Sequence, residues 1–247
     1  MAKPHELKTI AIERNKSKEI LKKSYYNYLS YNDKYTLDGN SYKGHHIIED
    51  LGINVCPYCN RNFIYNINQT RSNYQLDHFY PKKKYPFLCI SFYNLIPSCI
   101  TCNGLTGKSD TDVKVNPYDD TFPFEKIYFE LIILKPDFYY NIDSFDIKLN
   151  LSLLTDIQKH RFQTNIEAFN LEKHYQKHKE YVLKIIQKNL TYSDSYIENL
   201  YKEFEGTIFN NEREMKELIT DSTIKYFHLR PLSKLTHDIA KELGLLD

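Results

Sequence analysis

Two short stretches, CPYC at residues 56–59 and CITC at residues 99–102, decide how the middle of this chain can fold. Each CxxC turn places two thiolates about 3.5–4 Å apart on one side of a tight loop, as tetrahedral zinc with Zn–S bonds of about 2.3 Å requires. Two such pairs complete a closed site with no open coordination position. We therefore predict a structural zinc ion held by Cys56, Cys59, Cys99 and Cys102.

The rival interpretations of these cysteines are a redox pair or disulfide bonds. A thioredoxin-like CxxC lies at a strand-to-helix junction in a βαβ unit, which the surrounding sequence lacks. Disulfides are rare in a reducing compartment, and residues 1–20 carry scattered charges instead of an apolar signal core. We therefore expect a cytoplasmic protein whose fifth cysteine, Cys89 in the apolar run FLCIS, is a buried free thiol.

The composition is that of a soluble globular protein with no membrane partner. The 247 residues are 41% hydrophobic and 26% charged, and no apolar run approaches the roughly 20 residues that span a bilayer. The net charge of +1 argues against binding nucleic acid by bulk electrostatics alone. Residues 56–118, however, hold seven lysines and arginines against three aspartates and no glutamate, a local excess of +4.

The segment around the cysteine pairs differs from its flanks. Residues 53–118 are rich in cysteine, proline, glycine and asparagine and lack a long periodic apolar run, so a metal must replace a large core there. Before this segment we expect a helix over residues 5–31, a loop over 32–44 and a short helix over 45–52 that ends at Gly52.

The C-terminal half changes from strands to helices. Residues 126–134 and 145–152 predict an antiparallel hairpin, and the sequence is helical from about residue 155 to a last helix over 232–244. Two of these helices carry predicted apolar stripes, formed by Leu183, Ile186 and Leu190 and by Ile197, Leu200 and Phe204.

These patterns predict an α+β protein. A small metal-stapled ββα unit is inserted in a mostly helical scaffold that also carries a β-hairpin. The expected parts are an N-terminal helical segment (1–52), the metal-stapled core (53–118), and the hairpin with the C-terminal helices (119–247). The last part is large and poor in reactive residues, so it is the candidate surface for docking a partner.

Polar residues lie between the two cysteine pairs. The stretch YQLDHF (74–79) predicts a strand that ends in Asp77 and His78, Asn94 precedes the second pair, and Asn103 follows it directly. If the strands pair and the last segment turns into a helix, Asn103 lies in its first turn. It can then face Asp77 and His78.

This set of residues suits phosphodiester hydrolysis. Histidine has an ordinary pKa of about 6.5, so His78 can take a proton from water at neutral pH. Asp77 and the carbonyl oxygen of Asn103 can hold Mg²⁺. Asn94 is expected to bridge backbone groups of the loop and to orient His78. The candidates for holding a nucleic-acid backbone are Lys82, Lys83, Lys84 and Lys108, although a lysine run is also common in a solvated loop.

Residues 56–118 resemble HNH endonucleases of the ββα-metal class, in the subgroup with CxxC zinc knuckles. The resemblance rests on the two cysteine pairs together with Asp77, His78, Asn94, Asn103 and Lys108. It implies a DNA endonuclease in which His78 is the general base and Asp77 and Asn103 hold Mg²⁺ or Mn²⁺, and which leaves a 5′-phosphate and a 3′-hydroxyl. The family often has histidine at the position of Asn103, and the carboxamide disfavours soft transition metals.

Longer stretches resemble a narrower group. LDHFYPKKKYP (76–86), SFYNLIPSCITCN (91–103) and RPLSKLTHDIAKELG (230–244) are similar to the HNH subunits of Septu-type and retron-associated anti-phage defence systems. That similarity implies a nuclease that works with an ATPase subunit. The near-neutral net charge fits such a partnership, because a nuclease that binds DNA weakly alone stays harmless until a partner delivers it.

Two other functions are compatible with the same residues. A zinc-stapled binding module without catalysis could recruit another enzyme, and an RNA or tRNA nuclease could use the same chemistry, since the reaction acts on the phosphodiester. His174 and His178 have a spacing that can bind metal on a helix. No HExxH glutamate lies between them, so we expect a solvated or partner-facing helix surface there.

Overall fold

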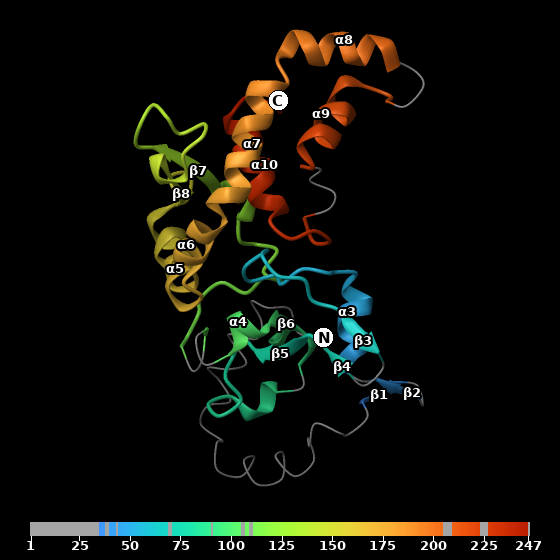
Figure 1. Cartoon of the computed structure of the whole chain (residues 1–247). Coiled ribbons are helices and arrows are strands. Elements are labelled where there is room, and N and C mark those ends of the chain that lie inside the picture. Colours follow the sequence, from blue (N-terminus) through green and yellow to red (C-terminus); the bar gives the residue numbers. More distant parts are fainter. Residues whose placement is uncertain are drawn as a thin grey trace. The chain divides into compact units, whose positions relative to one another are not determined.

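The computed structural model describes residues 35–37, 40–42, 44–68, 71–89, 91–104, 107–108, 111–204, 209–222 and 227–246 (Figure 1). The helix predicted over residues 5–31 lies outside these ranges. Within the loop predicted over 32–44, two short strands, β1 (Tyr35–Leu37) and β2 (Asn40–Tyr42), pair antiparallel, so the loop prediction is wrong for them. The Asp-Gly sequence between these strands is one that favours tight hairpins.

The short helix predicted before the cysteine pairs is present. It is α3 (Gly44–Leu51), and it ends at Gly52 as predicted. Gly52 has a φ of 61°, a left-handed conformation that glycine adopts without steric cost.

The chain divides into two compact units. The first contains the described residues up to Phe122 together with Ile157–Phe169, and the second contains Pro123–Asp156 and the residues from Asn170 onward. This division differs from the three predicted parts, because α5 (Asp156–Ala168) returns almost entirely to the first unit.

Polar contacts hold α5 in the first unit. Asn165 Nδ2 donates to the Val115 carbonyl at 2.7 Å, and Asn165 Oδ1 accepts from the Val115 amide at 3.1 Å. Arg161 Nη2 pairs with Asp119 Oδ2 at 3.2 Å. The backbone of the segment that follows the cysteine cluster therefore finds side-chain partners on a helix some fifty residues later in the chain, which local sequence patterns do not indicate.

The centre of the first unit is an antiparallel strand pair that runs into a helix. Strand β5 (Tyr74–His78) pairs with β6 (Leu95–Cys99), with Tyr74 opposite Cys99 and His78 opposite Leu95. All five residues of β6 are buried, and the chain continues directly into α4 (Ile100–Asn103). The order strand, strand, helix is that of the predicted ββα unit, and the mixture of short strands and helices is α+β, as predicted.

The remaining elements of the first unit are short. Strands β3 (Asn66–Asn68) and β4 (Arg71–Ser72) pair antiparallel, and the 3₁₀ turns η2 (Pro86–Leu88) and η3 (Phe92–Asn94) lie between β5 and β6. In this connection Leu88 is buried in a cluster of partly buried aromatic residues, namely Tyr80, Tyr85, Phe87 and Tyr93.

The second unit begins with the predicted hairpin. After the 3₁₀ turn η4 (Phe124–Lys126), strand β7 (Tyr128–Ile133) pairs antiparallel with β8 (Phe145–Asn150), which the 3₁₀ turn η5 (Ile142–Ser144) precedes. Tyr128 lies opposite Asn150, and Ile133 lies opposite Phe145. The strands predicted from alternating apolar residues are therefore confirmed.

Helices make up the rest of the second unit, as predicted. They are α6 (Leu171–Tyr175) with the 3₁₀ turn η6 (Gln176–His178), α7 (Lys179–Thr191), α8 (Asp194–Phe204), α9 (Glu212–Thr220) and α10 (Ser233–Glu242). Helix α10 contacts both β7 and α7 (Figure 1). The buried residues of these three elements and β8 include Phe129, Ile147, Ile185, Ile186, Leu235 and Ile239. None of the described helices is long and apolar enough to cross a membrane.

The buried face of α7 differs from the predicted stripe. Ile186 is buried as expected, but Leu190 is 64% exposed, and Val182 and Ile185 are buried instead. Apolar residues occur on both flanks of Ile186 along the helix, so periodicity alone does not determine which flank faces the core. On α8, Ile197 is buried but Phe204 is exposed.

The two C-terminal histidines are neither fully buried nor fully exposed. His174 lies in α6 and His178 in η6, and both are half-buried. The His178 ring packs edge-on against Tyr175, with ring centroids 6.2 Å apart. A solvated or partner-facing surface therefore stays a prediction for this pair.

Two carboxylates of α10 cover the outer edge of β7. Asp238 Oδ2 accepts from the Phe129 amide and Glu242 Oε2 accepts from the Leu131 amide, each at 2.9 Å. Asp238 and Glu242 are four residues apart on a helix, and Phe129 and Leu131 are two residues apart on a strand. Both separations are about 6–7 Å along the element, so the two carboxylates have the same spacing as the two amides that they bind. Burial raises the pKa of the Asp238 carboxyl, although Lys234 lies 2.7 Å away.

Candidate metal centre and polar network

The four cysteines of the two CxxC pairs form one buried cluster. Their Sγ atoms all lie within 4.8 Å of one another, and the Cys59 and Cys99 sulfurs are 3.8 Å apart. Tetrahedral zinc with bonds of about 2.3 Å separates its sulfur ligands by about 3.8 Å. The cluster therefore has the dimensions of a four-cysteine site, and it can hold a metal such as zinc.

The first cysteine pair lies in a tight turn. The Asn60 amide donates to the Cys56 carbonyl at 2.8 Å, and Asn60 adopts a left-handed φ of 47°. Asn62 Nδ2 donates to Cys99 Sγ at 3.2 Å. Hydrogen bonding from Cys102, the other cysteines and Asn62 lowers the pKa of the Cys99 thiol, whereas burial raises that of Cys56. A bound cation would keep all four groups as thiolates.

Cys89 lies apart from this cluster. It is partly exposed, so the expectation of a fully buried thiol is wrong, although burial still raises the pKa of the thiol. Its backbone carbonyl is 3.1 Å from His78 Nε2. The contribution of Cys89 to the network is therefore its peptide oxygen.

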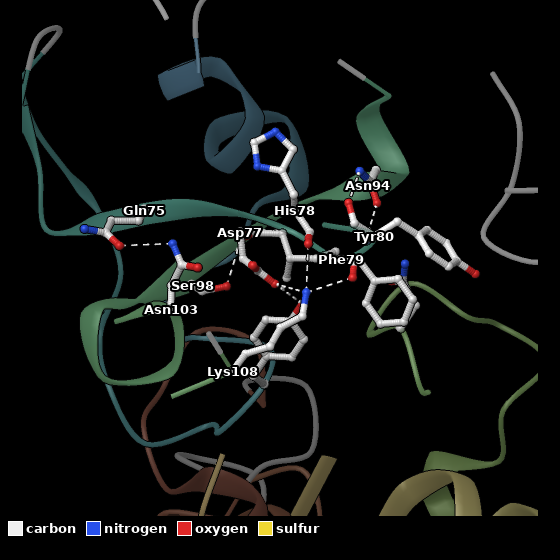
Figure 2. A network of polar contacts seen from close by, with 12 residues as sticks. Gln75, Asp77, His78, Phe79, Tyr80, Asn94, Ser98, Asn103 and Lys108 are labelled. Atoms are coloured by element: carbon white, nitrogen blue, oxygen red, sulfur yellow. Dashed lines mark hydrogen bonds and ion pairs between the residues drawn. The ribbon is translucent and has the colours of Figure 1, made fainter. Parts of the chain in front are cut away.

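The Asp77 carboxylate is buried and lies between the two cysteine knuckles. Its Oδ2 accepts from the Tyr58 hydroxyl at 2.7 Å. The same oxygen accepts from Lys108 Nζ at 2.9 Å (Figure 2). Tyr58 belongs to the first CxxC turn and stacks on Phe169, with ring centroids 4.3 Å apart. Burial, and then the charge of Asp77, raise the pKa of Tyr58, so its hydroxyl remains a donor. No hydrogen bond to Asp77 Oδ1 is found among the described residues.

Lys108 is one of the most deeply buried side chains of the described chain, at 1% exposure. Besides Asp77, its Nζ donates to the carbonyls of His78 and Phe79, each at 2.8 Å. Burial lowers the pKa of the ammonium, and Asp77 opposes that shift. The predicted contact of Lys108 with a nucleic-acid backbone does not fit this position, because its three N–H groups are already bonded inside the protein.

The His78 imidazole points to the opposite side of β5 from the Asp77 carboxylate (Figure 2). Because the Cys89 carbonyl oxygen can only accept, His78 Nε2 is the donor in that 3.1 Å contact. The lone pair of the neutral ring is therefore on Nδ1. Burial, followed by the positive charge of Lys82, lowers the pKa of His78, which favours the neutral ring.

Asn94 connects the ends of the loop between β5 and β6. Its side chain is fully buried; Oδ1 accepts from the Tyr80 amide at 2.7 Å, and Nδ2 donates to the carbonyls of Tyr80 and Leu88 at 3.2 and 3.0 Å. The Asn94 carbonyl accepts from the Phe79 amide at 2.9 Å. This one residue therefore holds the backbone directly after His78, in agreement with the bridging expected for it.

Asn103 lies at the end of α4 and contacts β5. Its Nδ2 donates to Gln75 Oε1 at 3.0 Å. Gln75 and Asp77 are two residues apart on a strand, so their side chains share one face. Asn103 and Asp77 therefore lie on the same side of β5, away from the His78 ring (Figure 2). Among the described residues no hydrogen bond to Asn103 Oδ1 is found.

The lysine run lies on a turn between two prolines. Lys82, Lys83 and Lys84 are all exposed, and the Lys84 amide donates to the Pro81 carbonyl at 2.9 Å. Lys84 Nζ pairs with Asp112 at 3.1 Å, and both side chains are almost half exposed. These lysines can meet a ligand from solvent, unlike Lys108.

Sequence reasoning did not single out three participants in this network. Tyr58 lies between two cysteines of the cluster, and its hydroxyl is the signal that could have indicated a role. Gln75 and the Cys89 carbonyl carry no sequence signal, because a polar strand residue and a backbone oxygen occur everywhere.

A comparison with known proteins gives one partial relative. No protein family model and no solved structure match the chain. The chain is 33% identical over 90 residues to the Septu protein PtuB of Bacillus thuringiensis. The match covers 34% of this chain and 34% of that protein, so the chain spans about a third of the length of the curated relative it matches.

Proposed function

We propose that this protein is a metal-dependent endonuclease of the HNH type that hydrolyses phosphodiester bonds of DNA, as the nuclease of an anti-phage defence system. The observation that carries the proposal is the state of His78. Its ring is held through Nε2 by the Cys89 carbonyl, which leaves the Nδ1 lone pair available to a water molecule.

The proton chemistry follows from that geometry. A neutral ring is needed for a general base, and burial lowers the pKa of His78 in the direction that keeps it neutral. Nδ1 takes a proton from water, the resulting hydroxide attacks phosphorus, and the 3′-oxygen of the neighbouring nucleotide leaves. Products with a 5′-phosphate and a 3′-hydroxyl are those expected from the HNH resemblance.

Two side-chain oxygens suit a catalytic Mg²⁺ or Mn²⁺ ion. Asp77 Oδ1 and Asn103 Oδ1 lie on one side of β5 and accept no hydrogen bond from the described residues, and both are hard donors. A bound ion would stabilise the charge that builds up on the phosphoryl oxygens and the leaving group. In this role Lys108 and Tyr58 hold the other Asp77 oxygen and fix the carboxylate plane.

Substrate binding is assigned to the exposed lysine turn. Lys82, Lys83 and Lys84 follow β5 after a few residues, and residues 56–118 carry the local excess of positive charge. Lys108 is excluded from this group by its burial.

The defence role and the partner rest on sequence likeness. The 90-residue likeness to a Septu protein agrees with the resemblance of the motif to Septu-type HNH subunits. We propose an ATPase subunit as the partner, docked on the helices of the second unit. The net charge of +1 supports the idea that a partner brings the nuclease to DNA.

One observation favours a second function, a zinc-stapled binding module without catalysis. The Asp77 Oδ2 atom is already paired with a lysine ammonium inside the protein, and the His78 ring points away from that carboxylate. In such a module, substitution of His78 would leave binding of the partner and biological activity intact.

The test is a cleavage assay on the purified chain, alone and with a co-expressed ATPase subunit. Supercoiled plasmid, linear DNA and tRNA are incubated in parallel with Mg²⁺ or Mn²⁺. We expect nicking of DNA, and a loss of at least about 100-fold in rate for His78→Ala, because a general base contributes that much. The matched control is His160→Ala, an exposed histidine on α5. A folded His78→Ala protein that cuts like the parent would exclude the mechanism, and cleavage of tRNA alone would change the substrate class.

A further inference from the structure

The buried ammonium of Lys108 holds three acceptors, two of which are consecutive peptide carbonyls. Its Nζ is 2.8 Å from the oxygens of His78 and Phe79 and 2.9 Å from Asp77 Oδ2. An ammonium has three N–H donors, so this set uses all of them. The arrangement is therefore a saturated internal site that leaves no proton of Lys108 for an external ligand.

The directions of the two carbonyls show how the backbone runs at the end of β5. In a regular strand, successive carbonyls point in opposite directions. Because the oxygens of His78 and Phe79 both reach one nitrogen, the chain must leave the extended conformation at this peptide. From the other flank, Asn94 binds the amides of Phe79 and Tyr80. The backbone that carries the His78 ring is therefore held by Lys108 and Asn94 together.

The chain delivers Lys108 from the second zinc knuckle. The Lys108 amide donates to the Cys102 carbonyl at 2.9 Å. At Gly107 a Cβ atom would lie 2.1 Å from that same carbonyl oxygen, so only glycine permits this approach. The Cys102 peptide therefore sets the position of the Lys108 ammonium. The residue before Lys108 is Gly107, which no other residue can replace.

A lysine in this position is not exchangeable for other residues. Its interior location carries a desolvation cost, and three short hydrogen bonds to oxygen offset that cost. Arginine presents a planar fork that cannot point three donors at convergent acceptors around one nitrogen. Methionine has a similar length but no donors, so it would leave two peptide carbonyls and a carboxylate without their partner.

We propose that Lys108 is a positioning residue that transmits the geometry of the zinc cluster to the general base. Lys108 links the Cys102 carbonyl to the carbonyls of His78 and Phe79. In this way it orients the His78 ring toward the Cys89 carbonyl and toward substrate. The proposal rests on the proposed function for its effect on cleavage, but the link from Lys108 to the ring can be tested without any reaction.

The first experiment measures the His78 ring in the zinc-loaded full chain without nucleic acid. In ¹⁵N-histidine NMR spectra at pH 8, the parent should show the tautomer protonated at Nε2. In Lys108→Met we expect loss of that single tautomer, with zinc content unchanged. Lys84→Met is the matched control, because Lys84 is exposed and pairs with Asp112, and Tyr58→Phe removes only the other bond to Asp77 Oδ2. Both should keep the parent tautomer. An unchanged His78 signal in zinc-loaded Lys108→Met would overturn the proposal even if the protein is no nuclease.

The second experiment separates positioning from nucleic-acid contact. For Lys108→Met we expect kcat to fall about 10–100-fold, because misplacement of a reacting group by about 1 Å has an effect of that size, while KM for DNA stays within about 2-fold. A raised KM with unchanged kcat would show that Lys108 contacts DNA, against the proposal. If the parent protein does not cleave at all while the tautomer result holds, the proposed function fails and the positioning role stands.

A third measurement needs no variant and covers the case in which Lys108→Met does not fold. In the parent, the Lys108 ammonium should show scalar couplings across its hydrogen bonds to the carbonyl carbons of His78 and Phe79, and slow exchange of its protons with water. A rapidly exchanging ammonium without these couplings would contradict the proposal.

Discussion

The two units of this chain are stabilised by different means. In the first unit the central elements are short, with five residues in each of β5 and β6 and four in α4, and its interior contains four cysteines and the Asp77–Lys108 pair. In the second, α7 has thirteen residues, and most of the buried side chains are aliphatic or aromatic. Elements as short as those of the first unit cannot bury enough apolar surface to hold themselves.

This contrast explains where the candidate chemistry lies. A metal cluster can stabilise a region whose interior is polar. Such an interior can hold a neutral histidine and a buried carboxylate in fixed positions close to each other. The interior of the second unit is mainly apolar, and its buried carboxylate, Asp238, is already bonded to Lys234 and to the Phe129 amide. Each of the next predictions should affect one unit and leave the other unchanged.

The largest effect is expected from loss of the metal that we propose for the cysteine cluster. Structural zinc sites contribute about 10–16 kcal/mol of binding free energy to folding, so Cys102→Ser or chelation should unfold the first unit. Limited proteolysis should then show protection only in the second unit, and circular dichroism should show that part of the secondary structure is lost. Cys89→Ser is the control, because Cys89 lies outside the cluster, and it should keep full zinc content. Equal loss of protection in both units would contradict the division.

A substitution in the core of the second unit should destabilise that unit and leave the first unit unchanged. Ile147 is fully buried on β8, so Ile147→Ala should lower the free energy of unfolding of that unit by about 2–5 kcal/mol through lost burial and a cavity. Urea denaturation monitored in each unit gives the measurement. Zinc content and the His78 NMR signal should not change, and a variant that releases zinc would show that the two interiors are not independent.

A smaller effect is expected at the junction of α10 and β7. Asp238→Ala leaves the buried Phe129 amide without its acceptor, which should lower the stability of the second unit by about 1–3 kcal/mol. Glu198→Ala on α8 removes an exposed i, i+4 partner of Lys202 and should leave the unfolding midpoint unchanged. Similar shifts for the two variants would mean that the bond to the strand edge contributes little.

Sequence reasoning succeeds where the signal is local. The cysteine cluster follows from two pairs of fixed spacing, the β7–β8 hairpin from alternation, and the backbone bridging by Asn94 from the chemistry of a carboxamide in a turn. In each case the residues that matter are close in sequence or repeat a period. Such patterns are visible before any tertiary contact is known.

It fails where tertiary contacts decide. Lysine is almost always exposed, so the sequence suggests a surface role for Lys108, yet acceptors some thirty residues away make its burial possible. Likewise α5 joins the first unit through Asn165, whose partners lie fifty residues earlier. The opposite directions of the His78 and Asp77 side chains, by contrast, follow from strand alternation alone, since adjacent residues of β5 face opposite ways.

The carboxylates of α10 have a consequence beyond the stability of the hairpin. An isolated two-stranded sheet presents open edges, and such edges pair with strands of other molecules and nucleate aggregation. Here Asp238 and Glu242 occupy two amides on the outer edge of β7, and Gln176 Nε2 donates to the Ile147 carbonyl of β8 at 2.6 Å. Helix α10 thus covers the edge of β7, and a chain without α10 would leave that edge open to pairing with strands of other molecules.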